Sequence, residues 1–540
     1  MINPFWVIID LKKARVVNQN KKFNKIIYDG FLSKKNFYGA AAILKKLNDG
    51  LIEVYRDQFG IHQVFYSFQK NNIHISTTID GLKKSGVKLD FCIKKNITFV
   101  TSHYRYFVHP SNSSYYQNVF SLMPGQKLII RKNSFNLKKY INIKVNRKVK
   151  KSFEQLGKEY LKIIEDSIIE KLELKKKSIF ALSSGMDSST LVSIAKKLIG
   201  NPKVFTTVFE ERTDHDESTD VMKTSKSLGL KLYKIPIKER KVFDELEDFS
   251  HDADEPCATI TQLMHKMVSA KIKKLGFNLI FSGLGGDEAH SGEIEEYLYY
   301  FADLKYLKMS KKLSEDMVGW KKYHSTKIYP KNKKTLDSFF KKEIDFKQQG
   351  KVLLNIDRFY SYIHVLNNEI DVSKINEPIL RNPYKSYLLN KIYQDLFHET
   401  IPIVLNAETS NARNTKVSNV YPYLNHDVMN FSFSLPIEYR YKNGVTKHFL
   451  REITKNIVPD SSRKNYFKKG WNAPTDKWFK NTFKDKVLDM INSQDVRNRG
   501  IYDLKAIKNI LSQHIKNKQN HMMFLWQFLS YETWRYNKKN

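Results

Sequence analysis

The chain has 540 residues, of which 41% are hydrophobic and 13% aromatic, and it carries a formal net charge of +36 at pH 7. This length and apolar content suffice for two or three domains with real cores, which excludes an intrinsically disordered chain. No run of about 18 apolar residues is present, so we expect no membrane span. Lys is abundant together with Asn, Ile, Tyr and Phe, as an AT-rich coding sequence would produce, and we interpret the charge mainly as a solvated surface. Attraction to a polyanion or an acidic substrate is the alternative.

The cysteine content and the first residues indicate the cellular compartment in which we expect the protein. Cys92 and Cys257 are the only cysteines, too few for a disulfide framework and without zinc-ligand spacing. The segment 1–6 lacks the basic start and long apolar stretch of a signal peptide. We therefore expect a cytoplasmic protein.

The predicted elements divide the chain into two parts. Residues 1–148 are expected to be strand-rich, with β-prone runs at 6–9, 52–55, 64–66, 73–75 and 127–130. A helical pattern begins at Phe153, and strands are predicted at 178–182, 204–209 and 232–236, with helices between them. This alternation is typical of a parallel sheet with flanking helices, so we expect an α/β fold with domains at 1–148 and 149–540.

The most informative segment follows the first strand of this second part. It has the sequence LSSGMDSS at 182–189 and is followed by residues with helical spacing. A strand, a small-residue turn and a helix together place backbone N–H groups against a phosphate. Asp187 is itself an anion, so we interpret it as a ligand of Mg²⁺ that bridges to phosphate oxygens. Helix capping by Ser and Asp is the alternative for this loop alone.

A second loop of the same kind has the sequence SGLGGDE at 282–288, after the strand-like run 279–281. Glycines on both sides of Leu284 leave backbone amides open to a ligand, and Asp287 supplies a second carboxylate. A Gly-rich surface turn would explain this loop alone. Ligands bind beyond the carboxyl ends of parallel strands, so two such loops can face one ligand. The pair predicts a nucleotide triphosphate site.

These loops resemble the Ser-Gly-Gly-x-Asp-Ser loop of ATP pyrophosphatases and the Ser-Gly-Glu-Gly-x-Asp-Glu loop of the asparagine synthetase family. Further similar segments lie at 254–256, 422–425, 447–451 and 468–474, with weaker ones at 56–60 and 122–125. The resemblance covers nearly the whole chain. It implies an N-terminal domain that is a degenerate glutaminase of the Ntn-hydrolase type. It also implies a C-terminal ATP-pyrophosphatase domain with a doubly wound parallel sheet and added helices.

The resemblance also implies roles for individual residues. Those expected to bind ATP are Leu182, Ser183, Gly185, Ser188, Val208, Ser282 and Gly283. Asp187 and Asp287 are expected to hold Mg²⁺. Lys468 is expected to stabilise charge that develops in the reaction, although a lone Lys in so Lys-rich a chain is otherwise a surface residue. The family is an ATP-dependent carbon–nitrogen ligase: ATP adenylates a carboxylate with release of pyrophosphate, and an amine then displaces AMP to form an amide.

Two departures from the family pattern narrow the expected substrate. Glutamine-hydrolysing members use a cysteine at position 2, where this chain has Ile2, and an N-terminal nucleophile needs its own α-amine as base, so Cys92 is no substitute. Leu284 stands where asparagine-forming members carry Glu and β-lactam synthetases carry Tyr. The segment 418–420 also departs from the family's Glu-x-Arg. These changes favour an amine that the substrate itself provides, as in lasso-peptide macrocyclases.

We therefore expect intramolecular lactam formation in a peptide. The expected partners are a carboxylate substrate such as a ribosomal precursor peptide, a leader-binding protein and a protease. An ammonia-dependent asparagine synthetase-like enzyme is one alternative. A tRNA-modifying ATP pyrophosphatase is another, but the second loop disfavours it, and no interleaved aromatic and basic pattern indicates nucleic-acid binding. A catalytically dead scaffold is disfavoured because both aspartates are present.

Overall fold

The computed structural model describes most of the chain. The described residues are 3–22, 25–30, 41–48, 50–103, 106, 112–145, 151–209, 216–293, 295–324, 333–375, 377–378, 380–466 and 473–539. Lys468 and the predicted domain boundary between residues 148 and 149 lie outside them. In the described part of the chain, no helix has the length and apolar character needed to cross a membrane.

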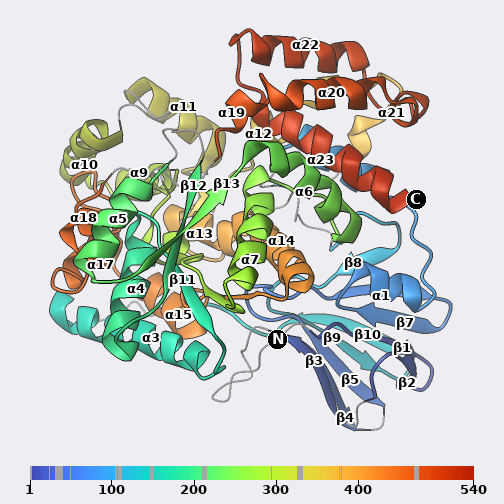
Figure 1. Ribbon diagram of the computed structural model, residues 1–540, viewed down its shortest axis with the longest axis horizontal. Coiled ribbons are helices and arrows are strands. Elements are labelled where there is room, and N and C mark those ends of the chain that lie inside the picture. The colour runs from blue at the N-terminus through green and yellow to red at the C-terminus, as the bar shows by residue number, and fades with distance from the viewer. Residues whose placement is uncertain are drawn as a thin grey trace.

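The N-terminal part contains two antiparallel five-stranded sheets (Figure 1). One has the order β2-β1-β7-β6-β8, with bounds Arg15–Gln19, Trp6–Asp10, Asn72–Ser76, Phe65–Gln69 and Val119–Ser121. The other has the order β10-β9-β5-β4-β3, with bounds Ser134–Lys139, Gln126–Arg131, Leu51–Tyr55, Ala41–Asn48 and Ile26–Gly30. Alternate residues of both sheets, such as Val7, Ile75 and Val54, are fully buried in one apolar cluster. The sheets therefore pack face to face, and the strands predicted here are confirmed.

The second part is built on a five-stranded parallel sheet with the order β13-β12-β11-β14-β17. Its strands are Leu232–Ile237, Val204–Phe209, Ser178–Ala181, Leu279–Phe281 and Ser418–Val420. The helices α3 to α7 are Phe153–Leu172, Met186–Ile199, Ser218–Ser227, Glu239–Asp252 and Ile260–Lys274. The mixed α/β fold that we expected is confirmed.

Both faces of this sheet are covered. Ile179 and Ile280 pack in a cluster with α6 and α7, whereas Phe180 and Phe281 pack in a second cluster with α3 and α4. Successive residues of a strand point to opposite faces, so the apolar runs of β11 and β14 supply both cores. The strand order reverses between β11 and β14, which are direct neighbours. The two loops singled out in the sequence follow these two strands.

Helices make up most of the remaining chain. The longer ones are α9 (Glu296–Tyr306), α10 (Ser310–His324), α11 (Lys333–Glu343), α13 (Tyr387–Phe397), α14 (Thr400–Thr415), α15 (His426–Ser434), α20 (Thr482–Asn492), α22 (Leu504–Ile515) and α23 (Met522–Lys539). The short ones are α1 (Ile79–Lys84), α2 (Ile93–Thr101), α8 (Gly286–His290), α12 (Ile356–Phe359), α16 (Ile437–Arg440), α17 (His448–Ile453), α18 (Asp460–Arg463), α19 (Thr475–Trp478) and α21 (Gln494–Asn498). A two-stranded sheet joins β15 (Ile344–Asp345) to β16 (Lys351–Val352).

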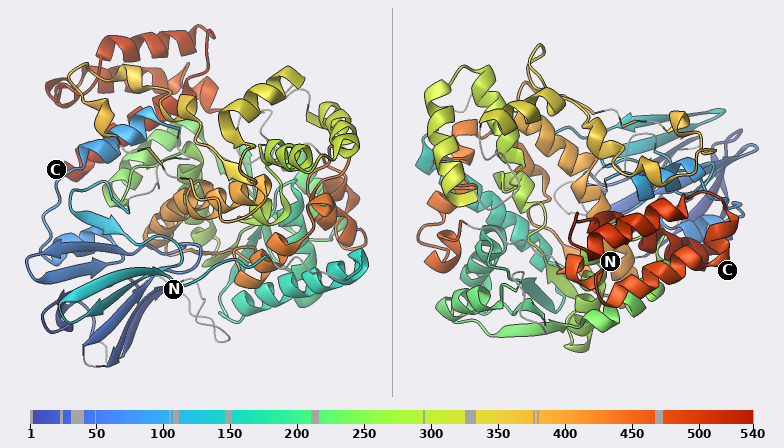
Figure 2. Two further views of the ribbon diagram at one scale, coloured as in Figure 1. Left: turned by 180° about the vertical axis from the view of Figure 1, so that it is seen from behind. Right: turned by 90° about the horizontal axis from the view of Figure 1, so that it is seen from above.

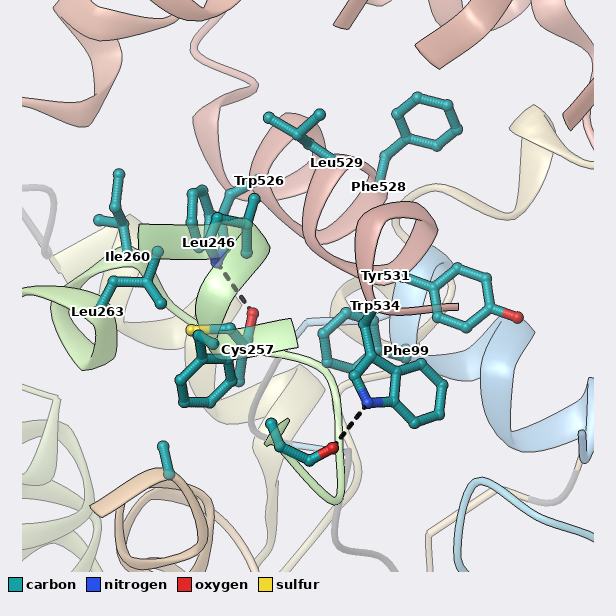
Figure 3. Close-up of a cluster of buried hydrophobic side chains, with 14 of the residues drawn as sticks. Phe99, Leu246, Cys257, Ile260, Leu263, Trp526, Phe528, Leu529, Tyr531 and Trp534 are labelled. Atoms are coloured by element: carbon teal, nitrogen blue, oxygen red, sulfur yellow. Dashed lines mark hydrogen bonds between the residues drawn. The ribbon is translucent and has the colours of Figure 1, made fainter. Parts of the chain in front are cut away.

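The last helix, α23, joins the two parts of the chain. It lies beside α2 at the edge of the N-terminal sheets (Figure 2). Its indole groups donate hydrogen bonds to the segment before α7, from Trp526 to the carbonyl of Cys257 at 3.0 Å and from Trp534 to the carbonyl of Ala253 at 3.1 Å (Figure 3). Phe99 of α2 packs in the same buried cluster. The two parts therefore share a core.

Polar contacts also connect the two parts. Asp254 accepts a hydrogen bond from the backbone N–H of Ile79 at 2.7 Å and forms an ion pair with Arg413 of α14. His426 is hydrogen-bonded to Gln58 at 2.9 Å. These contacts come from the segments at 254–256 and 56–60 that resemble family motifs, which gives those motifs a structural role.

Candidate active site

A cavity of ≈ 640 Å³ opens at the carboxyl ends of β11, β12 and β14. Both predicted loops line it. The lining includes these residues predicted from the sequence: Leu182, Ser183, Gly185, Asp187, Ser188, Ser282, Gly283 and Asp287. Val208 lies on β12 but is not among the lining residues, whereas Phe205, Thr206 and Thr207 of the same strand are. The cavity has the size of an ordinary small-molecule site.

The first loop is held by its own side chains. The backbone N–H of Ser183 donates to Ser188 Oγ at 3.0 Å, and that of Gly185 donates to Ser183 Oγ at 3.2 Å. The N–H of Ser184 donates to the carboxylate of Glu217 at 3.1 Å. Helix α4 begins directly after Gly185, and residues 183–188 line the cavity, so the N terminus of this helix lies at the cavity wall.

Lys447 joins the carboxylates of the two loops. Its Nζ lies 2.7 Å from Asp287 Oδ1 and also contacts Asp187 Oδ2. Lys447 precedes α17 with a φ of 57°, a left-handed conformation that costs an L-residue about 1–2 kcal/mol. The side chains of Lys447 and Asp187 are 6% and 13% exposed, so the contact is largely shielded from water. A strained backbone thus directs an ammonium group between two aspartates.

A buried histidine holds the Asp187 carboxylate in place. His290 Nδ1 lies 2.9 Å from Asp187 Oδ1, and the hydroxyl of Tyr160 lies 2.7 Å from His290 Nε2. Burial lowers the pKa of His290, so the imidazole is neutral at pH 7. The neutral ring then donates from Nδ1 to the carboxylate and accepts from the Tyr160 hydroxyl. Burial raises the pKa of Asp187, but Lys447 and the His290 hydrogen bond outweigh it and bring the pKa below its ordinary value.

Two glycines allow the carboxylates to approach so closely. A Cβ on Gly286 would lie 2.4 Å from Asp187 Cγ. A Cβ on Gly292 would lie 2.1 Å from Asp287 Oδ1 and 2.2 Å from Lys447 Cε. Larger residues at these two positions would therefore displace the charged groups.

The aspartate pair suits Mg²⁺. In the described part of the chain, no group of three or more His, Cys, Asp or Glu side chains could hold a metal ion. Mg²⁺ does not need such a group, because it is commonly bound by one or two carboxylates together with substrate phosphates and water. Lys447 already places one positive charge between Asp187 and Asp287, so Mg²⁺ held by both carboxylates would take the place of this ammonium group.

A second polar group lies on another wall of the cavity. His265 of α7 is hydrogen-bonded through Nδ1 to Glu408 of α14. Asn419 of β17 donates to the other carboxylate oxygen of Glu408. All three residues line the cavity.

The cavity differs in charge from the chain as a whole. Among the described residues, its lining contains five carboxylates, Asp187, Glu217, Asp287, Glu293 and Glu408, and two permanent cations, Lys447 and Arg451. The chain itself carries +36. The net charge of the chain therefore gives no guide to the charge of the group bound in the cavity, and the described part of the lining favours a cationic or metal-bearing ligand.

Arg451 connects the cavity to the segment before Lys468. Its guanidinium donates to the carbonyls of Arg463 at 2.6 Å and Asn465 at 3.1 Å and lies over the ring of Tyr466. Burial lowers the pKa of Arg451 to about 10, against the opposite influence of Tyr466. Tyr466, the last described residue before the segment 467–472, lines the cavity.

Sequence reasoning did not place four of these residues in the site. Lys447 and Arg451 were visible only as part of the segment similar to Lys-x-x-Leu-Arg. His290 and His265 had no local signal, because a single histidine on a helix is more often a packed core residue. Their partners come from distant elements that only the folded chain brings together.

Comparison with known proteins gives matches over most of the chain. The family model described as asparagine synthase matches residues 159–536. Glutamine-hydrolyzing asparagine synthetase 1 of Bacillus subtilis is 25% identical over 519 residues, covering 92% of this chain and 76% of that protein. Amidase chry2 of Gibberella zeae is 20% identical, covering 84% of this chain and 72% of that protein. Amidase chyE of Penicillium rubens is 19% identical, covering 88% and 75%.

Proposed function

Because the chain belongs to the asparagine synthase family, we propose that it activates a carboxylate with ATP for attack by an amine that the substrate itself carries. Family membership makes the chain an ATP-dependent carbon–nitrogen ligase. The observation that carries the proposal is the single cavity into which both loops, their two aspartates and Leu284 face. A leucine at that position neither gives nor takes a proton.

The roles of the site residues are part of this proposal. Ser183, Gly185, Ser188 and the N terminus of α4 bind the triphosphate, and Leu182, Ser282 and Gly283 bind the adenosine. Asp187 and Asp287 hold Mg²⁺, which neutralises phosphate charge when bound. His290 keeps the Asp187 carboxylate in one orientation. Lys468 stabilises charge on the reacting acyl group, and Val208 contributes to the adenine site from its strand.

The assignment of domains is also proposed. Residues 1–148 form a degenerate glutaminase-like domain of the Ntn-hydrolase type, and residues 149–540 form the ATP-pyrophosphatase domain. The face-to-face antiparallel sheets support the first assignment, and the reversal of strand order at β11 and β14 supports the second. The first cysteine in the sequence is Cys92.

The reaction that best suits these features is lactam formation within a peptide. An Asp or Glu side chain would be adenylated, and the peptide's own N-terminal amine would attack it, as in lasso-peptide macrocyclases. A leader-binding protein and a protease would then be the partners, in the cytoplasm. The acid-rich described lining of the cavity supports an amine as the second group, because an amine arrives as an ammonium ion and loses a proton before it attacks.

The test is incubation of the purified chain with ATP, MgCl₂ and the short peptide encoded beside its gene. We expect a product that is lighter than the peptide by one water, together with AMP and pyrophosphate. The Asp187→Asn variant serves as the inactive control. If the mass of the peptide stays unchanged although another cyclase accepts the same peptide, lactam formation by this chain is contradicted.

Direct use of ammonia is the second candidate. It is favoured by the match to an asparagine synthetase over 92% of the chain. This candidate predicts aspartate-dependent exchange of pyrophosphate into ATP and formation of asparagine from ammonium chloride. Failure of L-aspartate to stimulate the exchange would remove it.

A further inference from the structure

The hydrogen-bonded pair of His265 and Glu408 has the geometry of an oriented base. Glu408 is 6% exposed and accepts hydrogen bonds on both carboxylate oxygens, one from His265 Nδ1 and one from Asn419. The His265 side chain is 32% exposed and lines the cavity. A carboxylate that accepts from Nδ1–H fixes the tautomer of the ring and leaves Nε2 as the unprotonated nitrogen.

Amide formation requires such a base. An amine that attacks an acyl-adenylate carries a proton that it must lose before the amide is stable, and general-base assistance contributes roughly 10²- to 10⁴-fold to rates of this kind. Leu284 cannot take the proton. Of the five carboxylates in the described lining, Asp187 and Asp287 are engaged with Lys447, Glu217 accepts from the backbone of Ser184, and Glu408 accepts from His265 and Asn419. Imidazole is the side chain that most often performs this task at neutral pH.

We propose that His265, oriented by Glu408 and Asn419, is the general base that takes the proton from the attacking amine. The inference rests on the proposed function, because it needs an acyl-adenylate and an amine in this cavity. In the step, the amine nitrogen forms a bond to the acyl carbon and the bond between that carbon and the AMP oxygen breaks. The electron pair of the broken bond leaves with AMP, and the nitrogen's proton passes to His265 Nε2.

The alternative is that the His265–Glu408 pair is purely structural and only joins α7 to α14. Loss of a structural pair would impair adenylation and amide formation together, because both use the same cavity. Loss of a base would impair only the step in which the amine reacts. Hydroxylamine separates the two cases, because it is weakly basic, is largely unprotonated at neutral pH and attacks acyl-adenylates without help.

The experiment measures three rates for the same chain. The first is pyrophosphate exchange into ATP with L-aspartate, L-glutamate and the neighbouring peptide as acids. The second is hydroxamate formation with hydroxylamine and the best of these acids. The third is amide formation, with ammonium chloride for the amino acids and the peptide's own amine for the peptide. The variants are His265→Gln, His265→Ala and Glu408→Gln. The control is His251→Gln, whose side chain is 79% exposed on α6.

For His265→Gln we expect exchange and hydroxamate formation near the wild-type rates and a loss of about 100-fold in amide formation. Added imidazole should restore part of the amide formation of His265→Ala, and Glu408→Gln should show a smaller loss of the same kind. Equal loss of all three rates, or unchanged amide formation, would overturn the role of His265. Absence of exchange by the wild-type chain with every acid would instead contradict the proposed function, and the base would then have no reaction to serve.

Discussion

Lys447 Nζ lies 2.7 Å from Asp287 Oδ1 and contacts Asp187 Oδ2 as well, so one ammonium group joins carboxylates from two loops that are far apart in sequence. The two aspartates would repel each other without it. The same position between them suits Mg²⁺. Lys447 thus contributes to the stability of the ligand-free site.

This arrangement makes a prediction for Lys447→Met. Removing one partner of a buried ion pair lowers the free energy of unfolding by about 3–5 kcal/mol. Asp287 is partly exposed, so we expect a loss of stability at the low end of this range. The melting temperature should fall in buffer with EDTA and recover in part with MgCl₂, because a bound cation stabilises the folded state. Lys442→Met at an exposed position is the matched control. Equal melting temperatures of Lys447→Met and wild type in EDTA would contradict the prediction.

The glycine beside Asp187 makes a second prediction. In Gly286→Ala the new methyl group would lie 2.4 Å from Asp187 Cγ, so the carboxylate must turn away. We expect the variant to fold but to lose the rise in melting temperature that ATP with MgCl₂ gives the wild type. The far-UV spectrum and the melting temperature without nucleotide test the fold separately. A full nucleotide-induced rise in the variant would show that Asp187 is not needed in its present place.

Asp303 of α9 leads to a prediction about pH. Its carboxylate accepts hydrogen bonds from Ser386 Oγ at 2.7 Å and from the backbone N–H groups of Tyr387 and Leu388 at the start of α13. Burial raises its pKa to about 6, although these hydrogen bonds act in the opposite direction. The folded protein therefore holds this proton more tightly than the unfolded chain. The resulting stability is complete below about pH 4 and is lost as the pH rises through about 6.

Replacement of Asp303 by Asn should remove this loss, which is on the order of 3 kcal/mol for a shift of about two pKa units. The measurement is the difference in melting temperature between Asp303→Asn and wild type, followed from about pH 4 to about pH 7. The difference should change in favour of the variant as the pH rises. The same pH dependence in both proteins would exclude Asp303 as its source.

Trp534 supports the last prediction. It is completely buried, its ring contacts Phe91, Tyr115 and Tyr116, and its N–H bonds to the carbonyl of Ala253. Trp534→Ala should destabilise the protein by about 3–5 kcal/mol, and chemical denaturation measures the loss. Tyr536→Ala, at a residue 57% exposed on the same helix, should have little effect. If both variants lost the same stability, the loss in Trp534→Ala could not be attributed to the packing of Trp534.

The loops that line the cavity could be predicted from the sequence because each has a complete local signal. β11 and β14 are short apolar runs, and a turn of Ser or Gly with an aspartate follows each one. β17 had no such signal, since its three residues Ser418–Val420 are partly polar and, among the described strands, pair with β14 alone. Its place in the sheet depends on tertiary pairing, which no local pattern encodes.

The contacts that organise the site were less predictable than its loops. His265, Glu408 and Asn419 come from two helices and a strand, and their meeting depends on how α7 packs against α14. Residues 1–148 were predicted to be strand-rich, which is confirmed, but helices α1 and α2 in this part were not expected. Helix α2 completes its burial against α23, so its pattern makes sense only with the distant helix present.

The core shared by α2 and α23 imposes an order on folding. Gln527 of α23 donates a hydrogen bond to the carbonyl of Phe99, 428 residues away in the sequence. During synthesis at about 5–20 residues per second, the apolar side of α2 would wait roughly 20–90 s for its partner helix. The antiparallel sheets, with their own cluster, can form early, whereas the surface of α2 stays open until the end. A chaperone that shields this surface would therefore be needed from the synthesis of α2 until α23 has been made.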